Sequence, residues 1–234
     1  SLNPVFTIGN QLMEAILLHT DKNKEQAKAR AVEMLELVGV NEPEKRIRQY
    51  PHELSGGMRQ RVMIAMALAC EPDILIADEP TTALDVTIQA QILELMQALQ
   101  KKLGMAIIMV THDLGVIADM CDEIIVMYGG RVCERGTAED IFYRPGHEYT
   151  KGLLRSVPKA DGSKERLVPI AGTPINLLNM PKGCAFCTRC DEAMKICLTE
   201  VPPQVQMPDG HFASCWLAFK KLKNGTLGAE EVQS

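Results

Sequence analysis

The hydrophobic positions of the first part of the chain predict helices. Apolar residues recur at three- and four-residue spacing from about residue 8 to residue 40, and Gly39 offers a stop to this helical pattern. A second stretch, rich in alanine and methionine, follows a glycine turn at 54–58 and suits a closely packed helix. We expect this helix to end before Glu71 and Pro72.

Two short apolar runs then predict strands. Residues 74–77 (ILIA) form one run and residues 105–110 (MAIIMV) form the other. Between them, an apolar stripe along 88–103 predicts a long helix that Gly104 ends. Short unbroken apolar runs are typical of strands covered on both faces, as in parallel sheets. The pattern therefore predicts a βαβ unit and an α/β fold.

The remainder of the chain predicts a hairpin followed by a segment of different character. The run at 124–127 (IIVM) leads through Gly129 and Gly130 into another strand, and a glycine pair there indicates a tight turn. Beyond Pro145, prolines recur and the hydrophobic periodicity fades. We expect a helical subdomain over residues 1–50, a core over residues 51–155 and a C-terminal extension over residues 156–234.

Composition narrows the function classes. With 234 residues, 46% of them hydrophobic, the chain can bury one sizeable core and carry a small appendage. Its apolar runs are far shorter than the roughly 18 residues that a membrane-spanning helix needs, so membrane association is expected to be peripheral. A net charge of -5 argues against a nucleic-acid partner, and no signal peptide opens the sequence. Because the chain does not start with methionine, we expect it to be a fragment.

Polar residues follow both predicted strands. Asp78 and Glu79 come directly after 74–77, and ligands of parallel α/β sheets collect at that edge. Asp78 is suited to hold a hydrated Mg²⁺ on nucleotide phosphates, and Glu79 could polarise an attacking water. His112 follows the second strand and is expected at the same edge, near a phosphate oxygen or the water. The alternative is that these polar residues only end the strands in solvent.

Three motifs in order resemble the nucleotide-binding subunit of ABC transporters. LSGGMRQR (54–61) resembles the signature loop, ILIADEPTTALD (74–85) resembles Walker B with the D-loop, and IIMVTHD (107–113) resembles the segment of the switch histidine. The resemblance covers roughly residues 1–155 and implies a P-loop NTPase-like nucleotide-binding domain with a helical subdomain, in which residues 51–155 are the ATPase core.

The sequence also departs from the family pattern. No G-x-x-x-x-G-K-[ST] phosphate loop (Walker A) occurs, and neither the adenine-stacking aromatic residue nor the Q-loop glutamine is present. The chain alone is therefore not expected to bind ATP tightly. In the family, the strand corresponding to 105–110 lies beside the phosphate-loop strand, so we expect an incomplete sheet with an open edge and a risk of aggregation.

The resemblance implies a role for each matching residue. In the family, two subunits form a head-to-tail dimer, and the signature loop of each contacts the ATP held by the other, with the following helix directing its positive end at the γ-phosphate. Asp78 then holds Mg²⁺, Glu79 is the general base and His112 is the switch. Met58 replaces the glutamine of the commonest signature, which is a mild departure. The signature residues and the D-loop aspartate at the dimer seam are Leu54, Ser55, Gly56, Gly57 and Asp85.

Four segments resemble one branch of this family, the ATP-binding subunits of dipeptide and oligopeptide importers. Relatives that carry nickel complexes share these features. The four segments are SLNPVFTIGNQL (1–12), YPHELSGGMRQR (50–61), HEYTKGLL (147–154) and the cysteine motif GCAFCTRC…AMKIC…HFASC (183–215).

This branch implies an ATP-hydrolysing, energy-coupling subunit bound peripherally at the cytoplasmic face of the cell membrane. Its expected partners are a second, homologous or identical ATP-binding subunit, two transmembrane permease subunits and, indirectly, a peptide-binding protein. Two alternatives stay open. One is a metal-binding regulatory module that does not hydrolyse ATP, and the other is a soluble ABC ATPase that acts on nucleic acid.

Five of the eight cysteines crowd the segment 184–215. Disulfides need an oxidising compartment, which the lack of a signal peptide argues against. Zn²⁺ prefers paired C-x2-C knuckles, which the long final gap fits poorly, whereas an iron-sulfur cluster suits four thiolates in an irregular, proline-rich loop. Spacing alone leaves the ligands open, because Cys187 completes a C-x2-C-x2-C run as in bacterial ferredoxins. The family motif is associated with a [4Fe-4S] cluster and treats Cys187 as an extra residue. Its ligand positions correspond to Cys184, Cys190, Cys197 and Cys215.

Overall fold

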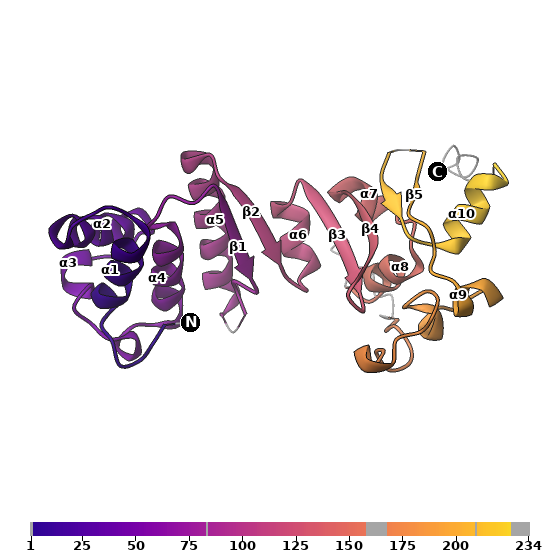
Figure 1. Cartoon of the computed structure of the whole chain (residues 1–234), viewed down its shortest axis with the longest axis horizontal. Helices are drawn as coiled ribbons and strands as arrows, with labels where there is room; N and C mark the ends of the chain where they lie inside the picture. The colour runs from indigo at the N-terminus through magenta and orange to yellow at the C-terminus, as the bar shows by residue number, and fades with distance from the viewer. Residues whose placement is uncertain (1, 83, 158–167, 209, 226–234) are drawn as a thin grey trace. The chain divides into compact units, whose positions relative to one another are not determined.

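The chain forms two compact units in its computed structural model, residues 1–113 and 114–234 (Figure 1). The structure describes residues 2–82, 84–157, 168–208 and 210–225. Parts of the expected C-terminal extension, residues 158–167 and 226–234, thus lie outside the described residues. The boundaries expected at residues 50 and 155 stay a prediction.

The first part of unit 1 is helical. It contains α1 (Ile8–His19), α2 (Lys24–Leu37), α3 (Pro43–Arg46), the 3-10 helix η1 (Pro51–Glu53) and α4 (Gly56–Leu68). The helical pattern over 8–40 is confirmed, but it forms two helices. The hydroxyl of Thr20 donates to the carbonyl of Ile16 at the end of α1, and Asn23 begins α2 in a capping box with Gln26. Gly39, with φ of +73°, follows the end of α2 as expected.

The βαβ unit predicted from the sequence is confirmed in unit 1. Strands β1 (Ile74–Asp78) and β2 (Ala106–Val110) pair in parallel, and α5 (Val86–Leu103) connects them. Gly104 ends α5 in the left-handed conformation, with φ of +68°. The register places Asp78 beside Val110, so the carboxyl ends of both strands meet at one edge.

The prediction that both faces of these strands are covered is wrong for this structure. Burial alternates along β1, and Ile74 and Ile76 are 55% and 68% exposed, whereas Leu75 is buried. Ile108 and Val110 of β2 are about half exposed as well. Within the described residues β2 pairs only with β1, which confirms the open edge expected from the family resemblance. The structure thus buries one face of β1, whereas the residues of β2 are exposed or half-buried.

Unit 2 is built around an antiparallel sheet in the order β3-β4-β6-β5. The predicted hairpin is confirmed, because Gly129 and Gly130 join β3 to β4 with φ of +57° and +74°, as a tight turn of this kind requires. The elements are α6 (Leu114–Met120), β3 (Glu123–Tyr128), β4 (Arg131–Thr137), α7 (Ala138–Tyr143), α8 (Glu148–Arg155), η2 (Leu177–Asn179), η3 (Cys187–Arg189), α9 (Lys195–Thr199), β5 (Val205–Gln206), β6 (Phe212–Ala213) and α10 (Trp216–Lys223).

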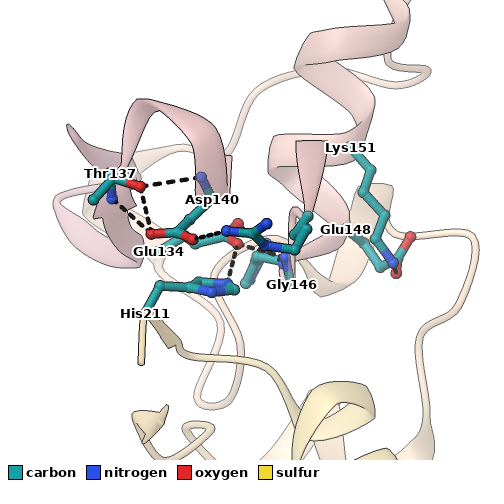
Figure 2. A network of polar contacts seen from close by, with 9 residues as sticks. Glu134, Thr137, Asp140, Gly146, Glu148, Lys151 and His211 are labelled. Carbon is teal, nitrogen blue, oxygen red and sulfur yellow. Dashed lines mark hydrogen bonds and ion pairs between the residues drawn. The ribbon is translucent and has the colours of Figure 1, made fainter. Parts of the chain in front are cut away.

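The buried carboxylate of Glu134 links the β5–β6 hairpin to strand β4. Glu134 in β4 is only 1% exposed, and it accepts hydrogen bonds from the backbone N–H groups of Gly146 and His147. The imidazole Nε2 of His211, beside β6, lies 3.2 Å from Oε1 of Glu134, and Figure 2 shows the two side chains facing each other. The two N–H donors thus offset the free-energy cost of burying Glu134. The contact with His211 holds the segment before β6 against β4.

Candidate functional site

The carboxyl edge of the β1–β2 sheet brings a carboxylate and an imidazole together. Glu79 directly follows β1, and its backbone N–H donates to the carbonyl of Val110 at the end of β2 (2.8 Å). His112 follows β2, and its Nδ1 lies 2.8 Å from Oε1 of Glu79. The parallel register therefore places residues that are 33 positions apart within hydrogen-bond distance.

The conformation of Glu79 is unusual for a residue other than glycine. Its φ is +49°, in the left-handed region, and Pro80 follows it. The Thr82 N–H donates to the Glu79 carbonyl (3.2 Å), which closes a turn over residues 79–82. In the same turn, Thr82 Oγ1 donates to Glu79 Oε2 at 2.7 Å. Both oxygens of the carboxylate are thus hydrogen-bonded.

These contacts set the charge of the pair. The hydrogen bond with His112, and then the one with Thr82, lower the pKa of Glu79, while Glu79 raises the pKa of His112. The imidazole ring itself is 82% exposed. Glu79 therefore stays ionised at neutral pH, and the side chain of His112 is exposed to solvent beside it.

Asp78 ends β1 and is exposed. Mg²⁺ bound with nucleotides keeps several waters and takes one or two carboxylates, so an exposed carboxylate at this edge fits such an ion. Asp78 is the residue that would hold it.

Asp85 has a structural partner. Its Oδ1 accepts from the backbone N–H of Ile88 (3.0 Å), so it forms the N-cap of α5. Gln89 in the first turns of α5 donates from Nε2 to Oδ2 of Asp113 (3.1 Å), which ties the helix to the segment of His112. No role was predicted for Thr82, Gln89 or Asp113, although Thr82 and Asp113 lie inside the motifs 74–85 and 107–113.

The signature loop lies at the start of α4. Ser55 is the N-cap of this helix, and its Oγ accepts from the N–H of Met58 (3.3 Å), whereas Leu54 is buried. A Cβ at Gly57 would come within 2.7 Å of Cγ2 of Ile88 in α5. The lack of a side chain at Gly57 therefore has a packing reason inside the subunit, independent of any approach to a nucleotide. The structure brings this loop against the start of α5, separately from the contact between Glu79 and His112.

A second candidate site lies in unit 2, where cysteines gather around one small pocket. The pocket is also lined by His147, Phe186 and Trp216. Burial raises the pKa of Cys184 to about 11 and that of Cys190 to about 12, so both thiols are neutral at pH 7. The cysteines that line it are Cys184, Cys187, Cys190, Cys197 and Cys215, all free.

The five thiols around this pocket are of the residue type that binds Zn²⁺ or an iron-sulfur cluster. Among the described residues, no group of three or more His, Cys, Asp or Glu side chains is placed to hold one ion. A Zn²⁺ site needs four ligands that converge on one atom. In a [4Fe-4S] cluster each thiolate binds a different iron, so the ligands are spaced more widely.

Two protein-family models match this chain, one near its N-terminal end and one in its C-terminal part. The family model "ABC transporter" matches residues 1–82, and "Oligopeptide/dipeptide transporter, C-terminal region" matches residues 133–197. Among the described residues, no helix is long and apolar enough to cross a membrane.

Two similar relatives come from Bacillus subtilis (strain 168). The chain is 52% identical to a dipeptide transport ATP-binding protein over 98% of its own length and 69% of the relative's. It is 57% identical to an oligopeptide transport ATP-binding protein over 93% of its own length and 61% of the relative's.

The fold is also that of solved ATP-binding cassettes. A dimeric structure of a post-hydrolysis state of such a cassette, bound to ADP and Pi, is 32% identical, with a TM-score of 0.51, over 59% of each chain. This confirms the expected ABC nucleotide-binding fold. The chain therefore belongs to the ATP-binding subunits of dipeptide and oligopeptide ABC importers, which are ABC-type ATPases.

Proposed function

We propose that a protein carrying this chain hydrolyses ATP to drive peptide import through two membrane-spanning permease subunits. The observation that carries this proposal is the hydrogen-bonded pair of Glu79 and His112, beside Asp78, at the carboxyl edge of the parallel strands. In this reading Asp78 holds Mg²⁺ on the nucleotide, Glu79 accepts a proton from the attacking water, and His112 contacts the γ-phosphate or that water. Peptide transport is inferred from the relatives.

Coupling to transport requires a second ATP-binding subunit, homologous or identical. The signature loop, residues 54–57, would face the ATP of that partner with the N-terminal end of α4, and Asp85 would lie at the dimer seam. ATP would then close the dimer, and the helical segment over residues 2–50 would pass this movement to the permeases at the cytoplasmic face of the membrane. A peptide-binding protein would act indirectly, by delivering the substrate.

The sequence holds no phosphate loop, so we propose that ATP is held jointly by this chain and a segment that carries such a loop. We expect the 234-residue chain alone to show no Mg²⁺-dependent ATP hydrolysis, and a protein that joins it to a phosphate-loop segment to hydrolyse ATP. Steady-state phosphate release from both proteins, each shown to be folded, measures this. Hydrolysis by the chain alone, or none by the joined protein, would contradict the proposal.

The two alternative functions are not favoured. A soluble ABC ATPase acting on nucleic acid and a regulatory module without hydrolysis both conflict with relatives that are transport ATP-binding proteins at 52% and 57% identity. The net charge of -5 also argues against a nucleic-acid partner.

We also propose that Cys184, Cys190, Cys197 and Cys215 hold a [4Fe-4S] cluster, with Cys187 as an extra thiol. The support is that thiols from three separate segments, 184–190, 197 and 215, line one pocket. A bound cluster would cross-link these segments in a region with little regular secondary structure.

A further inference from the structure

Both carboxylate oxygens of Glu79, the proposed general base, already have a hydrogen-bond partner. His112 takes Oε1 at 2.8 Å, and the hydroxyl of Thr82 donates to Oε2 at 2.7 Å. The Glu79 side chain is 38% exposed and Thr82 is exposed, so burial alone does not force this contact. The hydrogen bonds therefore determine where the carboxylate points.

The backbone explains why Thr82 can reach back to Glu79. Pro80 occupies the second position of the turn over residues 79–82, where its fixed φ suits the turn, and the Thr82 N–H to Glu79 carbonyl bond closes it. The N–H of Leu84 then donates to the carbonyl of Thr81 (3.2 Å), and Asp85 caps α5 directly afterwards. Thr82 is thus held from both sides, by the turn and by the start of α5.

We propose that Thr82 is a positioning residue for Glu79, which fixes the plane of its carboxylate against the edge of the sheet. The proposal rests on the function proposed for Glu79 as the general base. A partly exposed glutamate can still sample several rotamers, and ordering such a side chain costs up to about 2 kcal/mol. Each carboxylate oxygen has two lone pairs, so an oxygen that accepts from Thr82 or His112 can still accept from a water. The hydroxyl of Thr82 therefore orders the base without blocking it.

Substitution of Thr82 tests this in the protein that joins the chain to a phosphate-loop segment. We expect Thr82→Val to lower kcat for ATP hydrolysis by about tenfold and to leave KM for ATP within roughly twofold, because only the orientation of the base is lost. Thr82→Ser keeps the hydroxyl and should restore the original kcat. Thr87→Val is the matched control, since Thr87 is an exposed threonine in the first turn of α5. A Thr82→Val protein with unchanged kcat, or a Thr82→Ser protein as slow as Thr82→Val, would overturn the proposal.

A second measurement does not depend on hydrolysis. In crystals of the 234-residue chain, we expect Glu79 to adopt one side-chain conformation with Thr82 or with Thr82→Ser, and several in Thr82→Val. A single, unchanged conformation of Glu79 in Thr82→Val would overturn the positioning role. If Glu79→Gln proved to retain ATP turnover, the function assigned to Glu79 would fail, and this crystallographic comparison alone would decide the role of Thr82.

Discussion

Replacing Glu79 by glutamine is expected to reduce ATP turnover by about 10²- to 10⁴-fold, the range that general bases contribute, while ATP binding is retained. Glutamine has nearly the same size, and its amide oxygen can still accept one of the hydrogen bonds that Glu79 accepts from Thr82 and His112. It cannot take a proton from water, however. Turnover and nucleotide affinity would be measured in the protein that includes a phosphate loop.

Glu71→Gln provides the matched control for this experiment. Glu71 also precedes a proline and has a positive φ of +53°, but it lies between α4 and β1 and pairs with Arg30 (3.0 Å). The two substitutions thus remove the same charge from residues that share a positive φ and a following proline. We expect Glu71→Gln to keep full turnover. If Glu79→Gln retained turnover within a few-fold, or if both variants were equally inactive, the role assigned to Glu79 would be wrong.

Replacing Cys215 by serine is expected to abolish the brown chromophore and the bound iron of chain purified without oxygen. Cys215 lines the same pocket as the C-x2-C-x2-C segment, although it follows β6 and is far from that segment in sequence. Loss of one of four thiolate ligands leaves one iron without its protein ligand. Visible absorbance and the iron content per chain would be compared with those of the unchanged chain.

Cys187→Ser is the control for this prediction, because Cys187 lines the pocket but is an extra residue in the family motif. We expect it to keep both the colour and the iron. Colour that survives in Cys215→Ser but disappears in Cys187→Ser would reassign the ligands to the ferredoxin-like spacing. If the unchanged chain bound no iron at all, the cluster itself would be refuted.

Sequence predicted those parts of the fold in which the spacing of the apolar residues and the residues of the following turn indicate the same element. The apolar stripe along 88–103 with Gly104 behind it fixed α5, and the pair Gly129 and Gly130 fixed the β3–β4 hairpin. The meeting of Glu79 and His112 followed from parallel pairing alone, since each ends one of two adjacent strands.

Other features depend on information that a short window of sequence does not hold. The exposure of Ile74 and Ile76 depends on what covers the second face of the sheet, and apolar runs do not report this. The contact between Thr82 and Glu79 depends on the left-handed φ of Glu79, which local propensity does not predict for a glutamate. The pairing of β6 with β4 joins residues 134 and 213, which are remote in sequence.

In the proposed mechanism, the signature loop of one subunit completes the ATP site of its partner. The most direct test is a structure of the Glu79→Gln protein, including its phosphate loop, trapped with ATP and Mg²⁺. We predict a head-to-tail dimer in which Ser55, Gly56 and Gly57 of one subunit contact the γ-phosphate held by the other. A nucleotide-bound dimer in which these residues face solvent would contradict the account.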